Sequence, residues 1–160
     1  MVRIYTPMKK VPFQINNSSL TEACMNAFNT GENEQHEIGE VKTLAYRNGN
    51  KLVINDFVMG TYAEEFIKVV NKLYYFSYAR IRKVDGGLCY GYHTDEHGLL
   101  NIHVPLSGDF ERCFMIIDDE LFKPKLDGCL YIFDGSTMHT AINSGNVPRF
   151  HLHFEASIER

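Results

Sequence analysis

The sequence predicts a mainly β protein, a barrel or a two-sheet jelly roll, with helices in its N-terminal part. After Leu73 the chain is a series of short strand-like segments, at residues 75–84, 88–95, 99–106, 112–118, 129–134, 138–143 and 149–156. Turn signals separate them, for example Asp85-Gly86-Gly87 and Ser144-Gly145-Asn146. Many short strands at regular spacing are typical of sandwiches and barrels. On this pattern alone, an unrelated α+β protein with an antiparallel sheet remains the alternative.

The first 75 residues have a mixed α/β pattern. The predicted elements are a helix over residues 20–28, a polar loop over 30–40, a strand over 51–59 and a helix over 61–73. Ser18 or Ser19 would cap the first helix, and a glutamate pair lies near the positive end of the second. With 160 residues the chain is long enough to bury a core, so we expect one domain over residues 1–160.

Composition excludes several classes of protein. The net charge is −4, so no basic surface for nucleic acid is expected. The apolar runs are far shorter than a membrane span, and the N-terminus lacks the apolar stretch of a signal peptide. The four cysteines are scattered without metal-binding spacing, as in a reduced intracellular protein. These features predict a cytoplasmic protein that binds neither nucleic acid nor membrane.

Two of the predicted strands alternate strictly between apolar and polar residues. In residues 99–106, Leu100, Ile102, Val104 and Leu106 share one face, opposite Asn101, His103 and Pro105. In residues 149–156, Phe150, Leu152 and Phe154 share one face, opposite Arg149, His151, His153 and Glu155. A period of two indicates strands with two different faces. A row of polar residues on an inward face favours a barrel that holds a charged ligand.

The stretch "GYHTDEHGLL" contains two overlapping metal motifs. His93 and Asp95 form His-x-Asp, whereas residues 93–97 form His-x-x-Glu-His, similar to a zinc-peptidase motif that requires a helix. Glycines at both ends of that segment and the alternation that follows favour a strand. On a strand, His93 and Asp95 share a face and supply two legs of a 2-His-1-carboxylate iron site. We expect no metal-binding role for His97.

The remaining iron ligand and an anion-binding group follow later in the chain. His139 comes after a turn and ahead of a predicted strand, so it can supply the second histidine. Three protein ligands leave positions open for an organic chelator and for O2. If that chelator is 2-oxoglutarate, its far carboxylate needs a buried cation. Arg149, ten residues after His139, is placed to supply it, and arginine pairs with a carboxylate in a bidentate manner.

Together, these residues resemble the iron(II)- and 2-oxoglutarate-dependent dioxygenase superfamily. More narrowly, "HTDEHGLLNIHVPL" and "DGCLYIFDGSTMHTAINSGNVPRFHL" resemble the aspartyl/asparaginyl β-hydroxylase family, over roughly Arg80 to Phe154. The resemblance implies a double-stranded β-helix, the cupin-like jelly roll. Residues 76–160 would form the β-barrel core with the metal site, and residues 1–75 would buttress it. It implies iron at His93, Asp95 and His139.

The resemblance also implies contacts with 2-oxoglutarate. Arg149 would bind its far carboxylate, while His103 and Arg82 would make further polar contacts. Asn143 matches an asparagine that recurs in the family after the second histidine. The chain departs from the family at Asn101, where an arginine is usual, so a usual substrate contact is expected to be absent.

His151 marks another difference. Many members of the superfamily carry a small hydroxyl residue two positions after the arginine, where this chain has histidine. We expect His151 to contact the same carboxylate, through a ring N–H or, if protonated, with added charge. The alternative is a structural role in a polar row with His153 and Glu155.

The sequence therefore predicts an oxygenase that uses iron(II), 2-oxoglutarate and O2. It would hydroxylate an amino acid or peptide side chain, or another small molecule, with release of succinate and CO2. The alternative is a cupin-like metal protein that does not use 2-oxoglutarate and would have no need of Arg149. The oligomeric state stays open.

Overall fold

The structure is a computed structural model that describes residues 8–13, 15–95 and 99–157. The helices of this part are α1 (Asn17–Phe28) and α2 (Tyr62–Leu73), with short 3-10 helices η1 (Asp56–Val58) and η2 (Phe110–Arg112). The strands are β1 (Met8–Val11), β2 (Glu34–His36), β3 (Gly39–Asn48), β4 (Lys51–Ile54), β5 (Phe76–Val84), β6 (Leu88–Cys89), β7 (Leu99–Ser107), β8 (Cys113–Ile117), β9 (Glu120–Phe122), β10 (Leu130–Asp134), β11 (His139–Asn143) and β12 (Arg149–Ser157).

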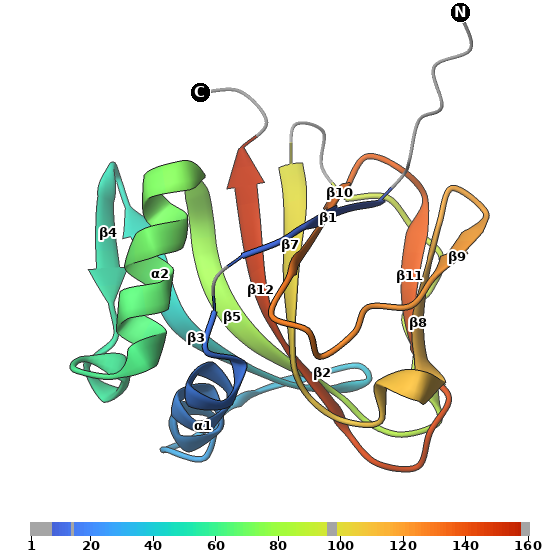
Figure 1. Ribbon diagram of the computed structural model, residues 1–160, viewed down its shortest axis with the longest axis horizontal. Helices are drawn as coiled ribbons and strands as arrows, with labels where there is room; N and C mark the ends of the chain where they lie inside the picture. Colours follow the sequence, from blue (N-terminus) through green and yellow to red (C-terminus); the bar gives the residue numbers. More distant parts are fainter. Residues whose placement is uncertain (1–7, 14, 96–98, 158–160) are drawn as a thin grey trace, which may run out of the picture.

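The strands form two antiparallel sheets. The large sheet has the order β1-β10-β7-β12-β5-β3-β2, with β4 paired to β3, and the small sheet has the order β6-β11-β8-β9. Figure 1 shows the large sheet curving past the helices, with β8, β9 and β11 across from its other face. The sheets do not close into a complete barrel. This mainly β jelly roll with helices in its N-terminal part confirms the predicted fold class.

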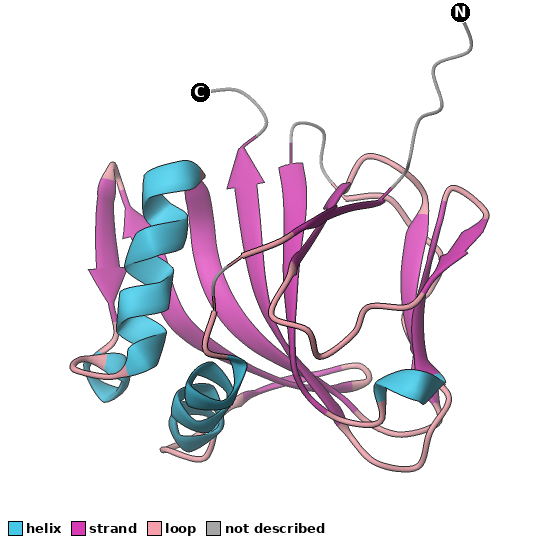
Figure 2. Ribbon diagram, in the orientation of Figure 1, coloured by secondary structure: helices cyan, strands magenta, loops and turns pink. Residues whose placement is uncertain are grey.

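The apolar core lies between the large sheet and the two helices, which Figure 2 shows in cyan on one side of the strands. From the helices it includes Leu20, Cys24, Phe28, Phe66, Ile67 and Val70, and from the sheet Ile81, Ile102, Val104, Leu152 and Phe154. The apolar faces predicted for residues 99–106 and 149–156 are thus confirmed as the side of β7 and β12 that packs on the helices. Their polar faces are turned toward the small sheet.

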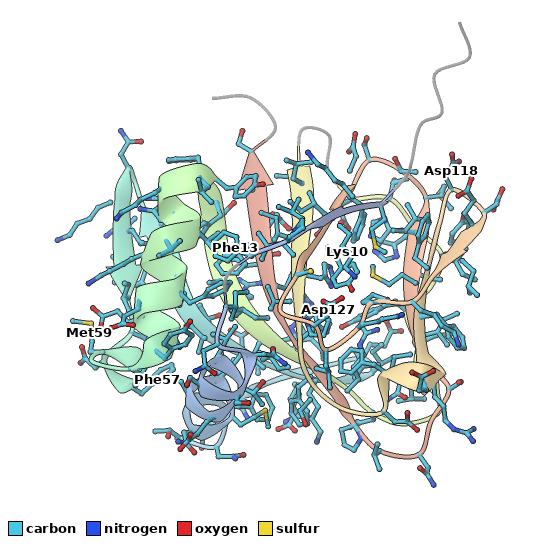
Figure 3. The ribbon with its side chains drawn as sticks, viewed as in Figure 1. Lys10, Phe13, Phe57, Met59, Asp118 and Asp127 are labelled. Atoms are coloured by element: carbon cyan, nitrogen blue, oxygen red, sulfur yellow. The ribbon has the colours of Figure 1, made fainter. Side chains whose placement is uncertain are left out.

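A smaller apolar cluster lies between the two sheets. It contains Met8, Met115, Ile117, Tyr131, Phe133 and Ala141. Strand β1 contributes Met8 and pairs with β10 at the edge of the large sheet. Lys10 on β1 forms a 2.6 Å salt bridge with Asp127, and Figure 3 shows the two side chains close together in front of the barrel. This arrangement closes one side of the space between the sheets.

Several local predictions were wrong. The first helix begins at Asn17, and Asn16 caps it instead of Ser18 or Ser19: its Oδ1 accepts a hydrogen bond from Ser19 N. The predicted loop at residues 30–40 contains β2 and the start of β3, and the predicted strand at 51–59 ends at Ile54 before η1. In the predicted strand 88–95, only Leu88–Cys89 forms a strand.

Strands β1, β3 and β9 were not predicted. Strand β1 pairs with β10 and β3 with β5, so these pairings depend on residues far away in the chain. Strand β9 pairs with the adjacent β8, but it is short and largely exposed and so gives no apolar pattern. No helix in the described part of the chain is both long and apolar enough to cross a membrane.

Candidate metal centre

Three side chains meet between the sheets to form the candidate metal centre. His93 and Asp95 lie in the segment after β6, and His139 is the first residue of β11. The backbones of His93 and His139 form an isolated antiparallel bridge, with N···O distances of 3.0 and 2.8 Å. One potential ligand atom from each side chain lies within 4.8 Å of the other two. The structure thus brings together the three residues that the sequence predicted as ligands.

Backbone carbonyls orient both imidazoles. His93 Nδ1 lies 2.5 Å from the carbonyl oxygen of Gly91, and His139 Nδ1 lies 2.7 Å from that of Thr137. Since a carbonyl only accepts, each Nδ1 carries a proton, and each ring that is not protonated on Nε2 as well presents the Nε2 lone pair. The two Nε2 atoms lie 3.3 Å from the two oxygens of Asp95. A lone pair facing a carboxylate needs positive charge between them, from a metal ion or from ring protonation.

The local electrostatics keep the carboxylate ionised. Burial raises the pKa of Asp95, but hydrogen bonds from His139 and Asn101 outweigh it and lower the pKa to about 2. Burial lowers the pKa of His139, while the contact with Asp95 outweighs this and raises it above the ordinary value. An ionised carboxylate next to two imidazoles is a suitable donor set for a divalent transition metal.

The inward faces of β5, β7 and β12 form the wall opposite the centre. A cavity of about 110 Å³ is lined by His93, Asp95 and His139 and by polar residues of these strands, Tyr78, Arg82, Asn101, His103, His151, His153 and Glu155. The alternation of β7 and β12 explains this wall, because every second residue points inward. A smaller cavity lies beyond His103, Met115 and His151, and Arg149 lines that one.

Arg149 and His151 are buried at this deeper end, each only 2% exposed. The Nε of Arg149 and the Nε2 of His151 have no hydrogen-bond partner, and none of the described residues places a carboxylate within 4.0 Å of the guanidinium. One terminal nitrogen of Arg149 lies 3.4 Å from His151 Nδ1. Burial lowers the pKa of both side chains. A buried guanidinium without an anionic partner is costly, so this is a pocket suited to an anion.

His103 lies between the deep end and the metal centre. Its ring stacks on that of His151, with a centroid distance of 4.6 Å and an interplanar angle of 14°. It lines both cavities. Burial holds its pKa well below 6.5, so the ring is neutral at pH 7.

Arg82 also lines the larger cavity, but its Nε donates a 2.9 Å hydrogen bond to His153 Nδ1. Asn143 lies away from the cavity and braces the chain after β11, where its Nδ2 donates to the carbonyls of Val84 and Val147.

Asn101 is a residue whose role the sequence analysis missed, since its Nδ2 donates a 2.9 Å hydrogen bond to Asp95 Oδ2. The sequence pattern could have indicated this role, because the alternation of β7 places Asn101 on the same face as His103. Residues 96–98, including His97, lie outside the described residues.

The fold and this site define a class of protein: a jelly-roll protein with a candidate His-Asp-His metal centre. The sequence match narrows the class, since residues 61–157 match the aspartyl/asparaginyl β-hydroxylase family. The chain belongs to this family, and it is a hydroxylase. The match extends further toward the N-terminus than the resemblance at Arg80–Phe154 and includes α2. Among curated proteins, none matches the sequence significantly.

Solved structures with similar folds include oxygenases at low sequence identity. A 2OG-Fe(II) oxygenase family oxidoreductase from Burkholderia pseudomallei has a TM-score of 0.69 and 11% identity, over 94% of this chain and 84% of that one. A Pseudomonas putida prolyl-4-hydroxylase has a TM-score of 0.68 and 12% identity, over 96% and 94%. A Trichoplax adhaerens prolyl hydroxylase, solved in complex with a hypoxia inducible factor peptide fragment, has a TM-score of 0.67 and 12% sequence identity, over 96% of this chain and 84% of that one. These likenesses show the shared fold.

Proposed function

We propose that the protein is an iron(II)- and 2-oxoglutarate-dependent oxygenase that hydroxylates an amino acid or peptide side chain. The observation that carries the proposal is the buried guanidinium of Arg149, which has no anionic partner among the described residues. It lines a small cavity that shares His103, Met115 and His151 with the larger cavity of His93, Asp95 and His139. A dicarboxylate with one end at the metal centre and the other at Arg149 would satisfy both sites. A cupin-like metal protein without 2-oxoglutarate would give Arg149 no such role.

The residues present fit the metal ion. His93, Asp95 and His139 offer two imidazole nitrogens and a carboxylate, the donor set of non-haem iron oxygenases. The carbonyls of Gly91 and Thr137 fix the ring orientations in advance. The described residues offer three donors, which leaves positions open for the co-substrate and O2.

The residues at the deep end also fit a carboxylate. Arginine only donates, so His151 Nδ1 accepts from Arg149 and the neutral ring carries its proton on Nε2. Neither that buried Nε2–H nor the Nε–H of Arg149 has a partner in the described part of the chain. Two unsatisfied donors on neighbouring side chains of β12 are suited to one carboxylate group. We assign His103 to the pocket wall and Arg82 to a supporting position beside it.

Iron(II) with 2-oxoglutarate and O2 supplies the oxidative chemistry, in which one oxygen atom enters the substrate C–H bond and the other the succinate formed with CO2. The protein's own contribution is placement. Arg149 neutralises the far carboxylate, which gives the co-substrate one orientation. The apolar residues Met115 and Phe133 line the cavity beside the polar wall and keep water away from the reacting groups.

The cavity opens past Glu155, which together with Thr94, Asp95 and Leu99 also lines an outer groove. This opening is the route for a substrate. The hydroxylase from Trichoplax that resembles this chain was solved with a peptide, which supports the proposed substrate class.

We propose that residues 1–160 act as one domain. The free cysteines support a cytoplasmic location.

The test is succinate release. Purified protein is incubated with iron(II), 2-oxoglutarate and air, with and without a panel of free amino acids and short peptides, and succinate is quantified. Wild-type protein should produce succinate faster with a correct substrate, whereas His139→Ala should produce none. Iron-dependent substrate oxidation without succinate release would favour the cupin-like alternative instead.

A further inference from the structure

A line of hydrogen bonds runs from Arg82 to the metal centre through residues to which the proposed function gives no role. Arg82 Nε is 2.9 Å from His153 Nδ1, His153 Nε2 is 2.6 Å from Asn101 Oδ1, and Asn101 Nδ2 is 2.9 Å from Asp95 Oδ2. The side chains come from β5, β12 and β7, three neighbouring strands of the large sheet. His153 and Asn101 are buried, 5% and 2% exposed.

The two ends of this line determine the direction of every bond in it. A guanidinium only donates, so His153 Nδ1 accepts and its neutral ring carries the proton on Nε2. His153 Nε2 then donates to Asn101 Oδ1, which leaves the amide NH2 of Asn101 for the acceptor-only carboxylate of Asp95. Burial holds the pKa of His153 well below 6.5, in agreement with a neutral ring. No other placement of protons satisfies all three contacts.

Gly135 provides a second, independent observation. A Cβ at this position would lie 2.6 Å from Asn101 Nδ2 and 2.9 Å from Asp95 Oδ2. Its backbone carbonyl accepts a 2.7 Å hydrogen bond from Asp95 N. A side chain at position 135 would push Asn101 and Asp95 apart, and the chain has glycine there.

We propose that Asn101 and His153 are positioning residues, which hold the Asp95 carboxylate in its ligating orientation through a line of bonds anchored at Arg82. The inference rests on the proposed metal centre and assigns a role to Asn101, where the resemblance implied a departure from the family. Side chains that orient a metal ligand typically affect metal affinity by 10–100-fold. They do so without touching the metal.

The experiment measures cobalt(II) affinity of the metal-free protein by calorimetry, together with the visible spectrum of the bound cobalt. Asn101→Leu should weaken binding about 10–100-fold and alter the spectrum, because Asp95 loses its fixed partner. His153→Phe should weaken binding by about tenfold, and His153→Gln should recover most of that loss, since an amide can accept from Arg82 and donate to Asn101. Unfolding transitions of the metal-free variants report their folding separately.

Gly135→Ala tests the same contact without removing any of its partners. It should weaken cobalt binding about as much as Asn101→Leu. The matched control is Gly145→Ala, whose added methyl would meet nothing closer than 3.3 Å and lies away from the centre; its affinity should equal that of the wild type.

Three outcomes are to be distinguished. Folded Asn101→Leu and Gly135→Ala variants that bind cobalt within about twofold of the wild type would overturn the positioning role alone. Wild-type protein that binds no cobalt would overturn the metal centre and the proposed function with it. Cobalt binding that depends on Asn101, in a protein that fails to release succinate, would keep this inference and reject the proposed reaction.

Discussion

Strand β12 has two faces with opposite chemistry. One face carries Phe150, Leu152 and Phe154, which pack against the helices and neighbouring strands. The other carries Arg149, His151 and His153, three buried polar side chains facing the space between the sheets. Burying apolar surface stabilises the fold, whereas burying polar atoms without partners costs stability. In the proposed function the inner face serves binding, and the comparison teaches that the apolar outer face of the same strand offsets its cost.

The largest expected effect on stability comes from a substitution on the apolar outer face of β12. Phe154 is fully buried, and its ring lies 5.0 Å from that of Phe76 and 6.0 Å from that of Phe66. Phe154→Ala should lower the free energy of unfolding by about 3–5 kcal/mol, measured by chemical denaturation. Cobalt affinity of the folded fraction should not change. A loss of metal affinity without a loss of stability would mean that the two faces are not separable.

Changing Arg149 on the inner face should have the opposite effect on stability. Arg149→Met roughly keeps the length of the side chain and removes a buried charge that lacks an anionic partner among residues 8–13, 15–95 and 99–157. The metal-free protein should become more stable by about 1–4 kcal/mol. The wild type should gain stability when 2-oxoglutarate is added with metal, because the ligand binds only the folded state. Arg149→Met should gain no stability from 2-oxoglutarate. A variant that is less stable than the wild type and is still stabilised by 2-oxoglutarate would contradict the role of Arg149 as the carboxylate-binding residue.

Acid should destabilise the inner face specifically. Burial, with the nearby arginines, holds the pKa of His103, His151 and His153 well below 6.5. As the pH falls below about 6.5, the unfolded chain takes up protons first, so stability present at neutral pH is lost. Each histidine contributes about 1.4 kcal/mol per pH unit to this slope. His139, whose pKa is raised, takes up its proton first in the folded state, so it opposes this loss as the pH falls toward about 6.5 and adds no slope well below that value.

The check is denaturation of metal-free protein at several pH values between 7.5 and the acid limit of folding, roughly the range in which histidine titrates. His151→Phe should reduce the slope by about one proton, or about 1.4 kcal/mol per pH unit. An unchanged slope would show that His151 is protonated in the folded state.

Much of this site could be predicted from local sequence. The alternation in residues 99–106 and 149–156 predicted both faces of β7 and β12, because side-chain direction along a strand depends only on parity. Likewise, the order of His93, Asp95 and His139 was enough to predict a shared centre. Strict alternation is a property of a single strand and needs no knowledge of its partners.

The missed features depend on contacts between distant segments. Nothing near Met8 shows that β1 will pair with β10, and the exposed residues of β2 have no apolar pattern to indicate a strand. The role of Asn101 required the positions of Asp95 and His153, which are 6 and 52 residues away. The requirement for glycine at position 135 was missed for the same reason, since the side chains that leave no room for a Cβ there lie on other segments.

The central claim is that one pocket holds iron(II) at His93, Asp95 and His139 and a 2-oxoglutarate carboxylate at Arg149. An anaerobic titration tests it directly, because iron(II) develops a visible charge-transfer band when a 2-oxo acid chelates it. Wild-type protein loaded with iron(II) should develop the band on addition of 2-oxoglutarate. At the same concentrations, Arg149→Met should bind iron but show little band, and His139→Ala should show none. A wild type without the band, or an undiminished band in Arg149→Met, would contradict the account.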